Sequence, residues 1–311
     1  MSSPSEPKYL YKYTPFSANS LGLLCRTQVF YSDPEKFNDP FDSKLFIDND
    51  VGDEFYKTTW HQVLFQILPK VDVYNIRAKA NYESSEFGSR KSNETARTVY
   101  ETVILDAIKD LLFTKLKRRG VLSLAEKWNC PLMWSHYGDH HKGICLEYTW
   151  EGREEKLAID KVNYDSSRRV GISEICNFLL SGSDEDRDKL IQKIYYNKAK
   201  EWRYEKEWRV LHLDPGTAYS APFLLNAIHF GIRADYAVRR SIIKLFSHSD
   251  DQQIKMYNIY ESGKGFSLRR DRIDTSEILS AGAPQPIFKI FDNLDLTNID
   301  VGDELDGEPE N

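Results

Sequence analysis

No stretch of this sequence is apolar for long enough to cross a bilayer, and the polar opening MSSPSEPK lacks the apolar core of a secretory signal. The GxxxxGKS/T loop, the GxGxxG turn and the GxSxG elbow are also missing, so NTPase, Rossmann dehydrogenase and α/β-hydrolase functions have no support. Cys25, Cys130, Cys145 and Cys176 show no CxxC spacing, which predicts reduced thiols and neither a zinc ribbon nor a disulfide framework. We therefore expect a cytoplasmic protein with no membrane-bound part.

The charge balance argues against one mode of nucleic-acid binding. A formal net charge of -6 is unfavourable for wrapping nucleic acid over a large surface, because that mode depends on Lys and Arg neutralising phosphates. A local basic groove remains compatible with this composition. Aromatic residues, by contrast, make up 13% of the chain. Tyr and Trp build cores, but they also offer ligands a flat face with a polar tip.

The order of expected elements predicts the fold class. A chain of 311 residues can bury a substantial core, and its strands are dispersed among helices without regular βαβ alternation. We predict a single α+β domain over residues 8–290, with a mixed or split β-sheet flanked by helices and a helical insertion near 53–119. Residues 1–7 and the acidic segment 296–311 are expected to be disordered tails.

The strictly alternating KYLYKYTPF predicts a strand with Tyr9, Tyr11 and Tyr13 on one face and Lys8, Leu10 and Lys12 on the other. Downstream, EKFNDPFD places Asn38 and Asp39 in a tight turn between two aromatic anchors. Further expected helices cover about 54–68, 96–119, 184–204 and 234–246, with a short helix within 130–139. Further expected strands cover 28–33, 121–126, 144–150, 207–213, 224–231 and 254–262.

The segment MWSHYGDHHKGICLEY holds three of the seven histidines. His136 and His140 stand at i and i+4, the spacing of zinc proteases, but Gly138 and Asp139 lie between them and no Glu completes HExxH. We therefore expect no metal here. The alternative, a metal-dependent nuclease or hydrolase that uses these residues with His141, predicts stoichiometric metal in the purified protein.

The same segment offers aromatic groups for a pocket. A helix over 132–138 followed by a strand lets Trp134, His136 and Tyr137 line a cleft. The competing interpretation is a packed aromatic patch beside a solvated turn, and for Trp134 the core is favoured.

A second charged segment, AKEWRYEKEWRVLHL, places Glu205, Glu207 and Arg209 on one side of an extended chain. Burying two carboxylates and a guanidinium is costly unless they are paired. One interpretation is an exposed Arg–Glu ladder. The other is a pocket carboxylate that holds a ribose hydroxyl or steers a cationic transition state.

Several blocks together resemble a bacterial family catalogued as domain of unknown function 2971. The blocks are LYKYTPF, FNDPFD, VLSLAE, LMWSHYGDHHKGICLEY, YEKEWR and LLNAIHFGIRAD, which run from about Tyr9 to about Asp271. The resemblance implies a single domain, bacterial and cytoplasmic, with no assigned activity.

The layout is also similar to that of ADP-ribosyltransferases, which place an early ribose-binding strand, a middle nicotinamide-stacking group and a late glutamate on a split sheet. The likeness implies NAD as substrate, Glu207 as the key carboxylate with Glu205 as the other late candidate, Tyr137 as the stacking ring with His136 beside it, and the role of a toxin or defence effector. The expected ligand-binding residues are Tyr11, Lys12, Tyr13, Asn38, Asp39, Trp134, His141 and Arg209.

A non-catalytic function is the main alternative. The aromatic and basic residues Lys8, Tyr9, Tyr11, Lys12 and Tyr13 can bind a nucleotide or a nucleic acid by stacking and charge. Expected partners are therefore a small-molecule nucleotide, a nucleic acid or a target protein.

Overall fold

The computed structural model describes residues 7–53, 55–88, 92–149, 158–247, 254–263 and 265–280. Except for residue 7, the predicted tails 1–7 and 296–311 lie outside these ranges. Over the described residues, no helix has the length and apolar character needed to span a membrane.

The strands β1, β4, β5, β6, β8, β10, β11 and β12 build one mixed sheet in the order β12-β11-β10-β5-β1-β4-β8-β6. Strands β10 and β11 run parallel, and the other neighbours are antiparallel. The predicted α+β class with a mixed sheet is confirmed. The bounds are β1 Leu10–Thr14, β4 Gly120–Ala125, β5 Ile144–Thr149, β6 Ile159–Lys161, β8 Glu207–His212, β10 Leu224–Phe230, β11 Lys255–Glu261 and β12 Leu268–Arg272.

Two small sheets lie outside it. One pairs β2 (Gln28–Tyr31) with β9 (Thr217–Ser220), and the other pairs β3 (Phe46–Asp48) with β7 (Arg169–Gly171).

The helices are α1 Ala18–Cys25, α2 Trp60–Phe65, α3 Lys70–Glu83, α4 Asn93–Leu116, α5 Pro131–Tyr137, α6 Ile172–Ser181, α7 Asp184–Tyr195, α8 Tyr236–Phe246 and α9 Thr275–Ser280. The short segments η1 (Pro34–Lys36) and η4 (Lys200–Glu205) are 3-10 helices, and η2 (Phe55–Thr59) and η3 (Ser84–Gly88) are π-helices.

The prediction of one long helix over 184–204 is wrong in its second half. Helix α7 ends at Tyr195, because the chain beyond it pairs with the segment around Asn163 instead of continuing the helix. The Asn163 amide donates to the Tyr196 carbonyl at 2.7 Å, and the Lys198 amide donates to the Asn163 carbonyl at 3.0 Å. The 3-10 turn η4 then leads into β8.

Strand β1 divides two cores, as its alternation predicts. Leu10 packs with Leu124 and Leu146 on one face, whereas Tyr11 and Tyr13 pack on the other. Helices α1 and α8 contribute to the Leu10 face, and α5 covers the tyrosine face through Met133 and Trp134.

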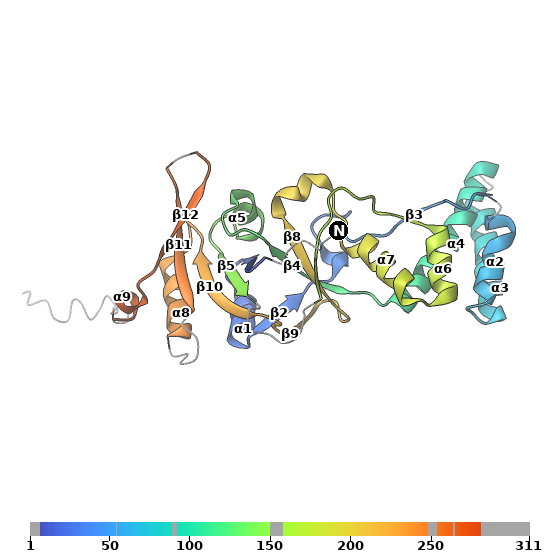
Figure 1. Ribbon diagram of the computed structural model, residues 1–311. Coiled ribbons are helices and arrows are strands. Elements are labelled where there is room, and N and C mark those ends of the chain that lie inside the picture. The colour runs from blue at the N-terminus through green and yellow to red at the C-terminus, as the bar shows by residue number, and fades with distance from the viewer. Residues whose placement is uncertain are drawn as a thin grey trace, which may run out of the picture.

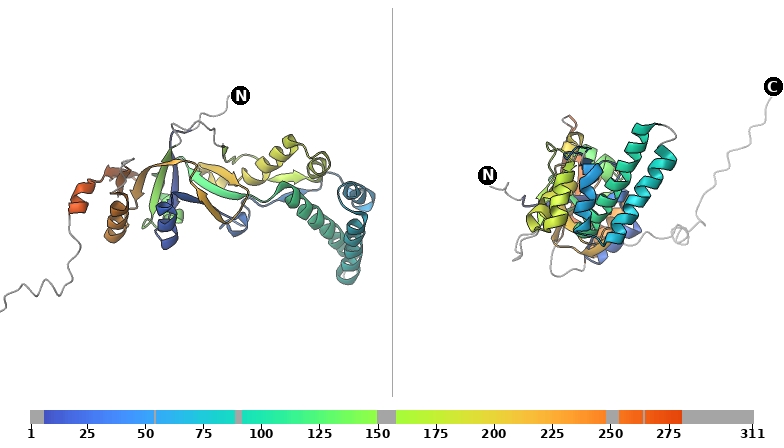
Figure 2. Two further views of the ribbon diagram at one scale, coloured as in Figure 1. Left: turned by 90° about the horizontal axis from the view of Figure 1, so that it is seen from below. Right: turned by 90° about the vertical axis from the view of Figure 1, so that its right-hand side faces the viewer.

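A third core lies at one end of the elongated molecule (Figure 1), away from the C-terminal hairpin β11–β12. Helices α3 and α4 lie side by side there, as Figure 2 also shows, and α6 contacts α4, α7 and the small-sheet strand β7. Fully buried members include Ile104, Ile108 and Leu112 from α4. The bounds of a separate helical insertion stay a prediction.

Gly143 provides a test of how tightly the α5–β5 connection packs on β1. A Cβ at this position would collide with the Thr14 carbonyl, which is backbone and cannot rotate away. We expect Gly143→Ala to lower the free energy of unfolding by about 1–3 kcal/mol in chemical denaturation. Gly22→Ala is the matched control, because its Cβ meets only the flexible Arg26 side chain within α1. That control should keep or raise stability by about 0.5–1 kcal/mol; equal effects of the two variants would contradict this packing.

Candidate functional site

A cavity of about 320 Å³ opens where β1, β4, α5 and the start of β8 meet the loop after β2. This volume lies in the lower part of the roughly 300–1,000 Å³ range of small-molecule sites. Strand β1 pairs with β5 along its whole length but with β4 only at Tyr11 and Ala125, so β1 and β4 part beside the cavity. The lining residues are Tyr11, Lys12, Tyr13, Phe30, Ser32, Asp33, Lys36, Phe37, Asn38, Asp39, Asp42, Ser123, Leu124, Ala125, Met133, Tyr137, Lys198, Glu205, Glu207 and Gly216.

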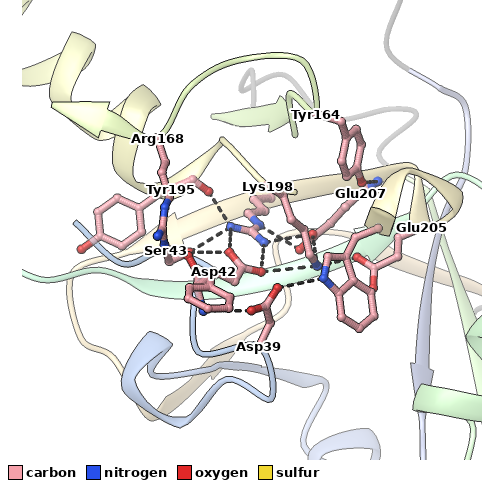
Figure 3. A network of polar contacts seen from close by, with 12 residues as sticks. Asp39, Asp42, Ser43, Tyr164, Arg168, Tyr195, Lys198, Glu205 and Glu207 are labelled. Carbon is pink, nitrogen blue, oxygen red and sulfur yellow. Dashed lines mark hydrogen bonds and ion pairs between the residues drawn. The ribbon is translucent and has the colours of Figure 1, made fainter. Parts of the chain in front are cut away.

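Behind the cavity wall, Arg209 is fully buried and holds two carboxylates. Its Nε donates to Glu207 Oε1 at 2.8 Å and its Nη2 to Glu207 Oε2 at 2.9 Å. The same guanidinium donates to both oxygens of Asp42, at 2.9 and 2.7 Å, and to Ser43 Oγ and the Tyr195 carbonyl. Figure 3 shows these contacts converging from β8, α7 and the loop after η1. A buried guanidinium with every side paired fixes those three segments to one another.

Lys198 joins the network from the other side. Its Nζ lies 3.0 Å from Glu207, 3.3 Å from Asp42 and 2.5 Å from Glu205. Burial by itself lowers the pKa of this lysine, but the three carboxylates outweigh burial and hold the pKa above its ordinary value. Lys198 is therefore a fixed cation.

The two glutamates on the wall differ in their state. Burial raises the pKa of Glu207, but the charges of Arg209 and Lys198 outweigh burial and hold the pKa below the ordinary value. Glu205 receives less compensation: Tyr137 donates to its Oε1 at 2.7 Å and Lys198 to its Oε2. Burial and the nearby charge of Glu207 keep the pKa of Glu205 raised. Glu205 is thus the more easily protonated of the two carboxyls.

The chain reaches this arrangement through one left-handed residue. The sequence predicts Glu205, Glu207 and Arg209 on one strand face, but Glu205 ends η4 and Lys206 has φ 47°. Only Glu207 and Arg209 share the strand face, as their direct contact confirms. The turn at Lys206 nevertheless returns both glutamates to the cavity.

The mouth of the cavity includes the turn FNDPFD. Asp39 Oδ1 accepts from the Phe41 amide at 2.8 Å, and its Oδ2 accepts from Trp202 Nε1 at 2.8 Å. Asn38 and Lys36 are exposed beside it and line the opening. The predicted tight turn thus joins the η4 segment to the η1 loop.

The segment MWSHYGDHHKGICLEY is a short helix, a left-handed turn and a strand. Gly138 ends α5 as predicted, and Asp139, His140 and His141 follow with φ of 48°, 51° and 70°. A left-handed conformation costs a non-glycine residue roughly 1–2 kcal/mol. The turn is held by bonds from the His141 amide to the Trp134 carbonyl and from the Gly143 amide to the Gly138 carbonyl.

This geometry separates the histidines. His136 is exposed beside Trp202 and Tyr204, whereas the His141 ring stacks on Trp134. Over the described part of the chain, no group of three or more His, Cys, Asp and Glu residues is placed to hold a metal ion. The alternative of a metal-dependent nuclease gains no support from this segment.

The predicted site residues therefore divide into two groups. Those that line the cavity are Tyr11, Lys12, Tyr13, Asn38, Asp39, Tyr137, Glu205 and Glu207, and those that do not are Trp134, His136, His141 and Arg209. Trp134 is fully buried and its Nε1 donates to the Trp128 carbonyl, so it is a core residue. Tyr13 is also buried, and its hydroxyl donates to the Lys127 carbonyl at 2.6 Å. Tyr11 and Tyr13 therefore do not form an exposed stacking platform for nucleic acid.

Lys198, Asp42 and Tyr164 are the residues that the sequence did not reveal. Asp42 lies at the end of FNDPFD, and Lys198 lies just before the EWRYEKEWR charges. Tyr164 Oη accepts from the Glu207 amide at 3.0 Å. The sequence signal for Asp42 and Lys198 was their position among clustered charges and aromatic residues. The sequence could not show which distant residues they would pair with.

A second buried polar cluster adjoins the cavity through Tyr11. Glu147 accepts from Asn226, from His229 Nε2 at 3.2 Å and from Arg270 at 2.9 Å. The His229 ring is stacked against Trp128 and Tyr257, and Arg270 lies over the same two rings. Burial raises the pKa of Glu147, but the bonds from His229, Arg270 and Asn226 outweigh burial and bring it to about 2.

A known family model matches one part of the chain that forms this site. Residues 133–210 match the model of a family described as "Protein of unknown function (DUF2971)". The matched segment contains Tyr137, Lys198, Glu205, Glu207 and Arg209. The resemblance expected from about Tyr9 to about Asp271 is therefore supported over 133–210, and the blocks on either side lie outside the match. No curated protein and no solved structure matches the chain, ADP-ribosyltransferases included.

Glu207→Gln tests the buried network. Removing one partner of a buried ion pair leaves charge uncompensated, so we expect the free energy of unfolding to fall by about 3 kcal/mol or more. The matched control is Glu201→Gln, because Glu201 is exposed on η4; it should change stability by less than about 0.5 kcal/mol. A Glu207→Gln protein as stable as the wild type in urea titrations would contradict a supporting role for Glu207.

Glu147 predicts a pH dependence. Its folded pKa of about 2 lies below the ordinary 4.5, so its contribution is complete above about pH 4.5 and is lost as pH falls toward 2. That contribution is on the order of 3 kcal/mol. The gap in unfolding free energy between wild type and Glu147→Gln should therefore narrow between pH 5 and pH 2.5 in a denaturant series. A gap that stays constant over this range argues against the assignment.

Proposed function

We propose that this protein cleaves the nicotinamide–ribose bond of NAD, by hydrolysis or by transfer of ADP-ribose, in the cavity between β1, α5 and η4. The observation that supports it is the convergence of three distant segments: Lys12, Tyr137 and Glu205 line one cavity. Their order along the chain corresponds to the early, middle and late positions of the ADP-ribosyltransferase layout. Depletion or transfer of a central cofactor fits a toxin or defence effector.

Glu205 is the better key carboxylate of the two on the wall. Glu207 is bonded on both oxygens by Arg209 and again by Lys198, so its charge is already neutralised. Glu205 has one partner on each oxygen, and one of these is the neutral hydroxyl of Tyr137. More of its negative charge remains for a developing cation. Glu207 then acts by holding Lys198 and Arg209 in place.

To cleave this bond, the protein needs mainly to orient NAD and to place a negative charge beside the ribose. The bond from C1′ to the nicotinamide nitrogen breaks, and its electron pair leaves with nicotinamide, which becomes neutral. Water or an acceptor adds to C1′ and a proton is released. Because the ribose passes through a cationic state, a fixed carboxylate such as Glu205 stabilises the transition state more than the ground state.

The other lining groups suit the rest of the ligand. Lys36 at the mouth supplies a cation for a phosphate, and Asn38 and Asp39 supply polar atoms for hydroxyls. The Tyr137 ring lies on the wall, where it bounds the space for the planar nicotinamide. Lys12 adds a second cation from the β1 side.

Glu205→Gln is the direct test. Purified full-length protein is incubated with NAD, and released nicotinamide is measured by chromatography beside Glu205→Gln and Glu201→Gln. We expect the first variant to lose at least a hundredfold in kcat while NAD still raises its Tm, because the missing charge acts in the transition state. Glu201→Gln should match the wild type.

Three results separate the alternatives. Stabilisation by NAD without nicotinamide release in the wild type would replace catalysis by nucleotide binding. Turnover that survives in Glu205→Gln would move the role to another group. If NAD neither stabilises the protein nor is turned over, NAD is rejected as the ligand.

The acid limb of the rate gives an independent check. The reaction needs ionised Glu205, whose pKa is raised, so kcat should fall with acid at a pH above the ordinary glutamate value. The Tyr137 hydrogen bond lowers this pKa, so Tyr137→Phe should raise it further and shift the limb to higher pH. A limb that stays in place or moves to lower pH contradicts the assignment.

A further inference from the structure

Two lysines line the same cavity in opposite surroundings. Lys198 Nζ touches three carboxylates, and its raised pKa keeps it protonated. Lys12 Nζ donates to the Ser123 carbonyl at 3.1 Å, and the structure records no ion pair for it over the described residues. In the proposed cleavage of NAD, Lys12 contributes only a positive charge. Its amine nitrogen does not act as a nucleophile in that reaction.

The position of Lys12 follows from the sheet. Its strand, β1, leaves β4 after the pair Tyr11–Ala125, and the Lys12 side chain crosses to the Ser123 carbonyl at this separation. The amine therefore stands at the cavity wall, part-buried. Burial lowers its pKa more than the charges of Glu207 and Glu205 raise it, so the neutral amine is more populated than in an exposed lysine. A neutral amine is the form that attacks carbonyl carbon.

We propose that Lys12 is a nucleophilic amine that forms an imine with the open-chain aldehyde of a phosphorylated sugar bound in this cavity. The carboxylate of Asp39 accepts hydrogen bonds from sugar hydroxyls, and Lys36 at the mouth faces the phosphate. The inference does not depend on NAD cleavage, because the aldehyde is the reacting group.

The step balances with water as its only by-product. The Lys12 nitrogen lone pair adds to the aldehyde carbon, and proton transfer from nitrogen to oxygen gives a carbinolamine. Its hydroxyl takes a proton from the Glu205 carboxyl and leaves as water while the C=N bond forms. The iminium proton then returns to Glu205. Tyr137, which donates to Glu205, keeps that carboxyl in place and acts as a positioning residue.

Reductive trapping tests the proposal on the wild-type chain. The full-length protein is incubated with ribose 5-phosphate and sodium cyanoborohydride, which reduces an imine to a stable amine, and labelled lysines are located by peptide mass spectrometry. We expect Lys12 to be labelled at least tenfold faster than Lys198 in the same cavity and than exposed Lys206. The comparison lies within one digest, so it does not depend on a variant that folds.

Two results would overturn the proposal. One is an unlabelled Lys12, and the other is labelling spread over exposed lysines at rates equal to that of Lys12. Glu205→Gln supplies a second reading, since it should slow labelling of Lys12 at least fivefold and leave Lys206 unchanged; equal rates at Lys12 would remove Glu205 from the step. Lys12 labelling in a protein that does not cleave NAD would support this inference and reject the proposed function alone.

Discussion

The pairing of Arg209 with Asp42 and Glu207 is the interaction on which the site depends. A buried guanidinium is tolerated only when its donors are satisfied, and here carboxylates, a hydroxyl and a backbone carbonyl satisfy them. Because those acceptors come from β8, the loop after η1 and the end of α7, the charge requirement fixes all three segments together. The cavity wall is the outer side of this network, so its shape is set by electrostatics as much as by packing.

The same network gives two neighbouring glutamates different chemistry. Lys206 in a left-handed conformation lets residues 205 and 207 reach one cavity from two kinds of backbone. Glu207 meets Arg209, and its pKa falls below the ordinary value; Glu205 meets Tyr137 and one lysine, and its pKa rises. Pairs of carboxyls whose environments separate their pKa values are typical of sites that combine charge stabilisation with proton transfer.

Local pattern predicted much of the fold and part of the site. The alternation in KYLYKYTPF placed Leu10 and Tyr11 on opposite faces of β1, and Pro131 and Gly138 bounded α5. The helix predicted over 184–204 was wrong because tertiary pairing with Asn163 overrode local propensity. Lys198 and Asp42 were missed for a related reason: sequence shows where charges lie but not which distant charge will meet them. Which of Glu205 and Glu207 has fewer cationic partners depends on these distant contacts, so the spacing in the sequence could not predict it.

The distance along the chain between the paired charges has a consequence for biosynthesis. Asp42 and Arg209 are 167 positions apart, so their contact cannot form until β8 has left the ribosome. Helices α3 and α4 contact each other over a short stretch of the chain, but their core also includes residues of α6 and α7 such as Phe178 and Ile194. The helical end can therefore be completed only after α7 has been made, shortly before β8. The cavity wall is finished later still, because Glu207 and Gly216 are among its lining residues, so a shorter nascent chain has no complete cavity.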